Sequence, residues 1–294
     1  MEVQPPPKEA PIPPSRYPRI PTRTPVKILE EMSDLCVNGD IKKFREVFES
    51  RLSIYDPDNF DIRDFWSVMV EAITQDNAQF IIELFRHGLE MKELYASQAV
   101  KAKAKNALQA FLQHGWDINQ PMSEVKPPVL GNAVEDDDMV PWLLDHGADP
   151  NRQSAIDLTP LSYAVECAPI SVIELMLARG GDVRKDQLLH HAIDRQSENI
   201  EVLKLLIGKG AAINTTMYQD HYASWRLYYF MGLGTVLHRA SELGKVDLVR
   251  YLVGEGVDPS ITDANGRTAL ECAAMLNQRE VVQELQKGEQ LMSS

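Results

Sequence analysis

The amino-acid sequence predicts an all-α solenoid, in which short antiparallel helix pairs stack in a row behind a disordered, proline-rich N-terminal tail. Three observations lead to this fold class: apolar residues recur at helical spacing, glycines end the short helices, and the whole pattern returns at a fixed interval. Because each helix is only about ten residues long, a pair is unstable alone in water and must bury its apolar face against neighbours.

The pattern is clearest between Gly234 and Asp258, where two apolar runs of helical spacing follow one another. The first run ends at Gly244 and the second at Gly256, as is typical of glycine at helix C-terminal caps. A second copy begins 33 residues later, since Thr268 repeats the position of Thr235 together with the residues that follow it. The segment is therefore one unit of a repeat array.

The motifs at the two ends of each unit resemble those of the ankyrin repeat family. The opening T-P-L-H of that family is similar to TPLS at Thr159 and TVLH at Thr235. Its closing L-L-x-x-G-A-D-x-N is similar to FLQHGWDIN at Phe111, LLDHGADPN at Leu143 and LVGEGVDPS at Leu252. The resemblance implies an ankyrin-repeat α-solenoid that binds other proteins through its loops and inner helices.

We predict two regions, a tail at residues 1–25 and a repeat domain at residues 26–294. About eight units lie near 26–51, 61–90, 91–117, 127–149, 158–182, 185–213, 234–258 and 267–288. The first unit lacks the threonine-leucine opening and is expected to be an N-terminal cap, because a terminal repeat has a neighbour on one side alone.

Several repeated residues have a structural role in this interpretation. The opening threonine is expected to cap the first helix through its hydroxyl group. The family resemblance implies that His238 donates a hydrogen bond toward the neighbouring loop, with His190 in the same role one unit earlier. Small residues let the two helices pack closely, namely Ala133, Ala164, Ala192, Ala240 and Ala273. Positive φ is expected after the second helix, at Gly88, Gly115, Gly147, Gly180, Gly210 and Gly256.

The tail holds about half of the chain's 18 prolines and has no apolar periodicity, so we expect it to be disordered or to form polyproline II. It matches SH3-ligand patterns at Lys8-x-x-Pro11-x-x-Pro14 and at Pro18-x-x-Pro21-x-Arg23. One interpretation is a ligand for an SH3-type domain of a partner. The favoured interpretation is an ordinary solvated tail, in which prolines produce such matches by chance.

The composition excludes some classes of function. A formal net charge of −13 argues against direct nucleic-acid binding, which requires a basic face, and favours a protein partner with a basic surface. The three cysteines lie far apart without a CxxC motif, as suits buried thiols in a reducing compartment. The sequence has neither a leader nor an apolar run of membrane-spanning length. We therefore expect a soluble protein of the cytoplasm or nucleus that does not bind a membrane.

Candidate chemistry is sparse. Most histidines occupy repeat-equivalent positions, and no CxxC or HxxxH pattern supports a metal site. The acidic run Glu135–Asp138 lacks EF-hand spacing and is expected at a helix start, with Asp137 as the N-cap, although a patch for a basic partner is the alternative. Because no catalytic motif is found, we predict no catalytic residue, no metal, no cofactor and no enzymatic activity.

The candidate binding site is a long connection between Asn214 and Gly234, which is dense in aromatic residues. Tyrosine and tryptophan are enriched in binding hot spots, and insertions in repeat arrays map to one face. We expect protein binding through this segment and through Trp116, which replaces the usual alanine after a closing glycine and is expected at an exposed loop. The residues concerned are Trp116, Tyr218, Tyr222, Trp225, Tyr228, Tyr229 and Phe230. The alternative, equally weighted for the insert, is that these rings pack on the array.

The sequence thus favours a non-enzymatic interaction module that acts as an adaptor, a scaffold or a regulator such as a transcription co-regulator. A regulatory subunit and a self-associating structural protein are the alternatives. An enzyme would need titratable groups that converge around Asp220 and His221 in the insert, and the sequence offers few.

Overall fold

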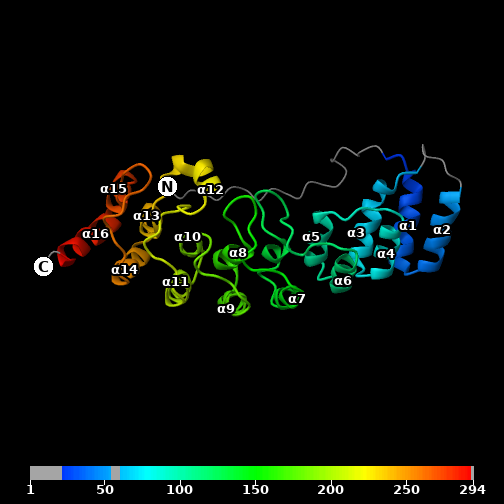
Figure 1. Cartoon of the computed structure of the whole chain (residues 1–294), viewed down its shortest axis with the longest axis horizontal. Helices are drawn as coiled ribbons and strands as arrows, with labels where there is room; N and C mark the ends of the chain where they lie inside the picture. The colour runs from blue at the N-terminus through cyan, green and yellow to red at the C-terminus, as the bar shows by residue number, and fades with distance from the viewer. Residues whose placement is uncertain (1–21, 54–59, 293–294) are drawn as a thin grey trace, which may run out of the picture. The chain divides into compact units, whose positions relative to one another are not determined.

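The regular structure of the chain is helical. A computed structural model describes residues 22–53 and 60–292, and their elements are α-helices and 3-10 helices beside two isolated β-bridges (Figure 1). The predicted all-α repeat fold is therefore confirmed. Residues 1–21 of the predicted tail lie outside the described residues. They include the whole of the first SH3-ligand pattern and most of the second, so both patterns stay predictions. Within the described ranges, no helix has the length and apolar character needed to cross a membrane.

The chain separates into two compact units, residues 1–90 and residues 91–294. The helices of the first unit are α1 (Val26–Asn38), α2 (Ile41–Ser53), η2 (Ile62–Phe65), α3 (Trp66–Thr74) and α4 (Ala78–Arg86). In this unit α1 packs against α3, and α2 packs against α4. The core of this unit is rich in phenylalanine. The ring of Phe44 meets that of Phe80 edge to face at a centroid distance of 4.9 Å, and the ring centroids of Phe44 and Phe48 lie 5.2 Å apart.

A buried carboxylate joins α2 to α4 in the first unit. Glu83 is 3% exposed, and Nε of Arg45 donates to its carboxylate at 2.8 Å. Arg86 adds a second bond at 3.1 Å, and Nε2 of His87 lies 3.3 Å from the other carboxylate oxygen. Burial raises the pKa of Glu83, but the Arg45 guanidinium and the neighbouring cations outweigh it and hold the pKa below its usual value. The carboxylate is therefore ionised and paired.

The second unit contains the remaining helices. They are α5 (Glu93–Lys101), α6 (Lys105–Gln113), η3 (Val129–Asn132), α7 (Met139–Asp145), α8 (Pro160–Cys167), α9 (Ile170–Ala178), α10 (Leu188–Asp194), α11 (Asn199–Gly208), α12 (Tyr222–Tyr228), η4 (Tyr229–Met231), α13 (Val236–Glu242), α14 (Val246–Gly254), α15 (Ala269–Met275) and α16 (Arg279–Met292). The first helices of successive pairs, α8, α10, α13 and α15, lie side by side, and α11, α14 and α16 form a second row (Figure 1). Their buried faces are aliphatic, with Ala164, Ala192, Ala240 and Ala273 at 0% exposure.

Threonines cap the first helices as predicted. Thr159 accepts from the backbone N–H of Ser162 at 3.2 Å, and Thr268 accepts from that of Glu271 at 3.3 Å. The side chains of Ser162 and Glu271 accept in turn from the backbone N–H of the threonine, which completes a capping box in each case. After the second helices, the six predicted glycines all have positive φ, between 81° and 101°.

The acidic run has a structural role. Asp136, and not Asp137 as predicted, accepts hydrogen bonds from the backbone N–H groups of Asp138 and Met139 at 3.0 and 3.1 Å. Asp136 lies two and three residues before these N–H groups, which is the spacing at which a capping side chain accepts from the start of a helix. Nζ of Lys103 lies 2.6 Å from Oδ2 of Asp136, and Nζ of Lys105 lies 2.8 Å from Oδ2 of Asp138. The lysines of the preceding pair thus neutralise part of this run.

Asparagines in the closing turns connect successive pairs. Asn151 donates from Nδ2 to the carbonyl of Gly180 at 2.9 Å and accepts from the backbone N–H of Asp182 at 2.8 Å. Asn119 makes the same two contacts one pair earlier, to Gly147 and Asp149, at 2.9 and 2.7 Å. Because each asparagine satisfies one donor and one acceptor of the next turn, it fixes the spacing of the loops.

The opening histidines form a second row of connections. His238 accepts from the backbone N–H of Thr235 through Nδ1 at 3.0 Å and donates from Nε2 to the carbonyl of Arg267 at 3.0 Å. His190 donates in the same way to the carbonyl of Gly234 at 3.1 Å. Burial lowers the pKa of His190 to about 4, so this ring is neutral at neutral pH. The role that the resemblance implied for both residues is therefore confirmed.

A third row of connections lies at the C-terminal ends of the first helices. Arg195, which is 5% exposed, donates to the carbonyls of Val165 and Ala164 in α8 at 2.8 and 3.4 Å. One pair later, Nζ of Lys245 donates to the carbonyl of Ile193 in α10 at 2.5 Å. A cation is favoured there because the last carbonyls of a helix are unpaired and carry the negative end of its dipole.

We expect Arg195→Met to lower the free energy of unfolding by about 2–3 kcal/mol, because two buried carbonyls lose a charged donor while the aliphatic stem is kept. Urea denaturation followed by circular dichroism measures this. The matched control is Arg184→Met, which removes an exposed ion pair with Asp182 and should cause no measurable change. Equal midpoints for the two variants would contradict the assigned role of Arg195.

Candidate functional site

The predicted aromatic insert is a small folded excursion between α11 and α13. Its N-terminal half contains a turn, and α12 and η4 form its outer part (Figure 1). His221 caps α12, since its side chain accepts from the backbone N–H of Ser224 at 3.2 Å. Gly232 then turns the chain back with a φ of 94°. A Cβ atom at this position would lie 2.9 Å from the carboxylate of Asp263, so a larger residue does not fit.

The base of the insert is fixed on both sides. The backbone N–H of Met217 donates to the carbonyl of Gly234 at 3.0 Å, which closes the excursion on itself. The backbone N–H of Ala264, in the next closing turn, donates to the carbonyl of Gly232 at 2.6 Å. The first bond closes the insert, and the second ties it to the loop before α15.

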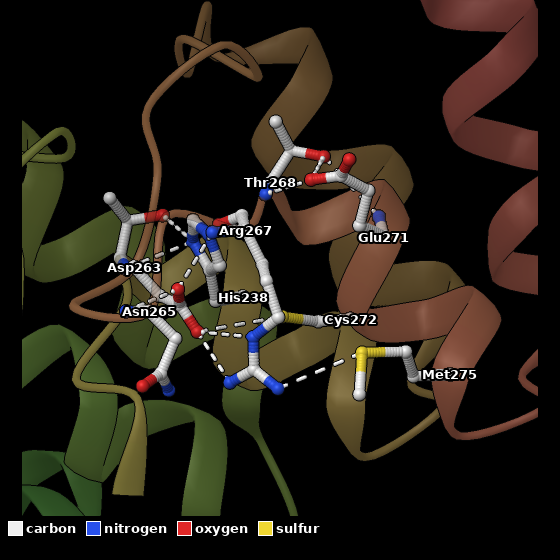
Figure 2. A network of polar contacts seen from close by, with 9 residues as sticks. His238, Asp263, Asn265, Arg267, Thr268, Glu271, Cys272 and Met275 are labelled. Atoms are coloured by element: carbon white, nitrogen blue, oxygen red, sulfur yellow. Dashed lines mark hydrogen bonds and ion pairs between the residues drawn. The ribbon is translucent and has the colours of Figure 1, made fainter. Parts of the chain in front are cut away.

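Asp263 organises the loop that receives the insert, as Figure 2 shows. This residue is 7% exposed, and the guanidinium of Arg267 donates to its carboxylate at 2.6 and 2.9 Å. Backbone N–H groups of Asn265 and Arg267 add bonds at 2.8 Å each. Burial raises the pKa of Asp263, yet these donors outweigh it and keep the pKa below its usual value. The carbonyl of Arg267 meanwhile accepts from His238, so the same loop serves the array and the insert.

One side of the insert is an aromatic ridge, which we define as Tyr222, Trp225, Tyr229 and Phe230. Their exposed fractions are 71%, 41%, 55% and 69%. Tyr222, Trp225 and Tyr229 follow one another at helical spacing and Phe230 comes next in the chain, with centroid distances of 6.3, 5.9 and 6.2 Å between successive rings. Leu227 and Met231 are further exposed apolar residues of the insert, at 52% and 60%. A groove of about 490 Å³ runs beside Tyr222 and Trp225, between α12 and residues 262–264.

The opposite side of the insert packs on the array. Tyr218 and Tyr228 are half-buried and lie 5.6 Å apart between ring centroids. Burial, followed by the neighbouring Tyr228, raises the pKa of Tyr218 to about 12. Ser224 is fully buried, and its Oγ accepts from the backbone N–H of Asp157 at 2.9 Å, 67 residues earlier in the chain. The packing interpretation therefore holds for Tyr218 and Tyr228, while the rings of the aromatic ridge stay exposed and their binding role stays a prediction.

Trp116 does not lie at the exposed position expected of it. It is 8% exposed and packs edge to face on Phe111 at a centroid distance of 6.2 Å. The equivalent residues Ala148, Ala211 and Val257 are also buried, at 6%, 8% and 1%. The apolar residue that follows a closing glycine therefore faces the core, and this repeated apolar character is the sequence signal that indicates a buried position. Trp116 is accordingly left out of the proposed binding surface.

Polar groups gather beneath the insert, around a cavity of about 440 Å³. Asp186 lies on its wall and accepts from the hydroxyl of Thr159, while Nε2 of Gln153 donates to Asp157 at 2.5 Å and to Asp186 at 3.2 Å. Nε2 of Gln187 donates to the second oxygen of Asp157 at 2.9 Å. Burial, reinforced by the charge of Asp157, raises the pKa of Asp186 to about 7 despite the bonds from Thr159 and Gln153.

The titratable groups of the insert are not arranged as a catalytic centre. His221 lies 3.1 Å from Oγ of Ser224, which gives a serine–histidine pair. The hydroxyl oxygen is fully buried and already accepts a bond from Asp157, so a substrate cannot reach it. Within the described part of the chain, no three His, Cys, Asp or Glu residues are grouped as metal ligands.

Comparison with known proteins decides the family. The model for "Ankyrin repeats (3 copies)" matches residues 130–217 and 189–293, which together cover more than half of the chain. This chain belongs to the ankyrin repeat family. It resembles the crystal structure of the human ASB11 ankyrin repeat domain with a TM-score of 0.52 and 20% identity, over 75% of this chain and 96% of that one. At this identity the likeness concerns the fold alone.

Curated relatives match parts of the ankyrin repeat chain. The putative ankyrin repeat protein FPV222 of fowlpox virus is 30% identical over 37% of this chain, and ankyrin repeat protein nuc-2 of Neurospora crassa is 28% identical over 45%. The B-cell lymphoma 3 protein homolog of Mus musculus is 31% identical over 40%. The matched segments span 15%, 12% and 24% of these relatives.

The two faces of the insert should respond differently to mutation. We expect Tyr218→Ala to lower the free energy of unfolding by about 2 kcal/mol, because it removes a half-buried ring that packs on Tyr228. Phe230→Ala, at a ring that is 69% exposed, should leave stability unchanged within about 0.5 kcal/mol. Thermal and urea denaturation of the two variants provide the comparison. A larger loss for Phe230→Ala would show that the faces are assigned the wrong way round.

Proposed function

We propose that this ankyrin repeat protein is a non-enzymatic interaction module and that a partner protein binds the aromatic ridge on α12. The observation that carries the proposal is the exposure of Tyr222, Trp225, Tyr229 and Phe230 on a segment whose base is fixed by backbone hydrogen bonds. Aromatic side chains supply a large apolar contact at a small cost in side-chain entropy, and a fixed base limits the rearrangement needed for binding.

The expected partner presents an apolar surface bordered by basic residues. Its apolar part would cover the ridge and the adjoining groove, whose walls include Met217, Leu233 and Ala264. The formal net charge of −13 would attract a basic protein over a long range. Family membership supports protein binding in general. The role as an adaptor, scaffold or co-regulator in the cytoplasm or nucleus is the form of this proposal that the sequence favours.

A ridge variant tests the proposal. We expect Trp225→Ala, Tyr229→Ala and Phe230→Ala together to weaken partner binding at least about 30-fold, since truncation of central aromatic anchors typically costs 2 kcal/mol or more. Partners are first selected as proteins that the natural chain captures, without regard to the variant. Their direct affinity for both purified chains is then measured by isothermal titration calorimetry at two salt concentrations.

The matched control for the ridge variant is the pair Met275→Ala and Leu276→Ala, at two other residues that are 63% and 55% exposed. This control should retain partner binding. Equal loss in the ridge and control variants, or unchanged binding in the ridge variant, would contradict the proposal. Loss of affinity for a second copy of the same chain, seen by light scattering, would instead assign the ridge to self-association.

A further inference from the structure

The fifth helix pair (α8 and α9) is joined to the sixth (α10 and α11) differently from the way in which the sixth is joined to the seventh (α13 and α14). In the sixth and seventh pairs a histidine donates to the carbonyl of the residue before the next N-cap, namely Gly234 or Arg267. In the fifth pair Ser162 stands at the position of this histidine and bonds within its own helix cap. The connection comes from the hydroxyl of Thr159 instead, and it goes to the side chain of Asp186, the residue before the next N-cap.

The acceptor at this junction is therefore a titratable carboxyl group in place of a backbone carbonyl. The carboxyl groups of Asp157 and Asp186 lie next to one another, since both accept from Nε2 of Gln153, at 2.5 and 3.2 Å. The other donors to the pair are the neutral side chains of Thr159 and Gln187. Two carboxyl groups in such contact hold one proton between them, because both charges together are costly in a partly buried site.

The charged and titratable neighbours of Asp186 come from three segments that line the same cavity. They are Arg184, Lys185 and His190 around the start of α10, Asp157 on the loop before α8, and Asp220 and His221 in the insert. Arg184 is engaged by Asp182 at 2.9 Å, and His190 is neutral because burial lowers its pKa. The contacts that Asp186 receives directly are thus from the neutral donors and from Asp157.

The carboxyl pair is linked to the insert through the backbone. The N–H of Asp157 donates to Oγ of Ser224 in α12 at 2.9 Å, and both residues are buried. His221, the cap of α12, lies 3.1 Å from the same hydroxyl. A displacement of Asp157 would therefore break a buried hydrogen bond at the inner face of α12.

We propose that the Asp157–Asp186 pair is a pH-sensitive latch, which holds α12 on the array while the two carboxyl groups share a proton and releases it when both are ionised. On ionisation the shared proton leaves to solvent, and the two carboxylates repel one another. The loop that carries Asp157 then moves away, and the bond to Ser224 is lost. The aromatic ridge is firmly placed in the first state and less well placed in the second.

The direction of the pH dependence follows from the raised pKa of Asp186. Stability from the shared proton is fully present below the ordinary aspartate value of 3.8 and is lost as the pH rises through about 7. His190 acts in the opposite sense, because its pKa is lowered to about 4 and its contribution is lost as the pH falls below 6.5. Above pH 6.5 the carboxyl pair therefore determines the trend.

Hydrogen exchange of the full chain tests the latch. Protection factors, corrected for the intrinsic exchange rate at each pH, are measured for residues 215–234 at about pH 6.5 and about pH 8.5. We expect protection in the natural chain to fall by about fourfold, which is the proton-linked change between these two pH values for a carboxyl group whose pKa is raised to about 7. Residues 246–257, in and after α14, serve as the internal reference and should not change.

The matched variant is Asp186→Asn, which keeps the shape of the side chain and remains neutral at both pH values. Asparagine also tolerates the φ of 58° found at this position. Protection in this variant should be independent of pH, and Asp157→Asn should give the same result if Asp186→Asn does not fold. A flat profile in the natural chain, or the same fall in the variant, would overturn the proposal. The measurement requires no partner, so its failure is separate from that of the ridge as a binding surface.

Discussion

The side-chain hydrogen bonds that cross from one helix pair to the next are the interaction on which the rest of the structure depends. Each pair is too small to bury its own apolar face, so its stability comes from its neighbours. Apolar packing alone tolerates sliding, whereas Asn151, His238 and Arg195 each bind a defined backbone group of another pair. These bonds lie at three different levels of the array, and together they fix the register of the stack.

The insert depends directly on this system of bonds. The carbonyl of Gly234 accepts from His190 of the sixth pair and also from the backbone N–H of Met217 at the start of the insert. The position of the insert is consequently set by the same residue that joins two pairs. An exposed aromatic surface on such a base differs from a flexible loop, because its rings are presented in a reproducible arrangement. Exposed apolar patches of this kind are uncommon on soluble monomers unless they bind something.

Much of the fold could be predicted from the sequence because the signals recur. The capping role of Thr159 and Thr268, the positive φ of the closing glycines and the role of His238 all follow from positions that repeat. The faces of the insert could not be predicted, because α12 occurs once and has apolar residues on all sides. Its orientation is decided by Ser224, whose partner Asp157 is 67 residues distant and carries no local signal. The exposed position predicted for Trp116 is wrong, because that prediction followed from the residue type, whereas the equivalent position is buried in the other pairs.

The departures from the repeat pattern occur next to one another in space, and this explains how they can influence one another. At the fifth pair Ser162 replaces the opening histidine, and a carboxyl side chain, Asp186, takes over as the acceptor at the next pair. The neighbouring Asp157 then places its backbone N–H under α12. If a carbonyl served as the acceptor here, as it does for His190 and His238, the junction would be insensitive to proton concentration. The substitution therefore introduces a titratable element at the point of the array that supports the exposed aromatic rings.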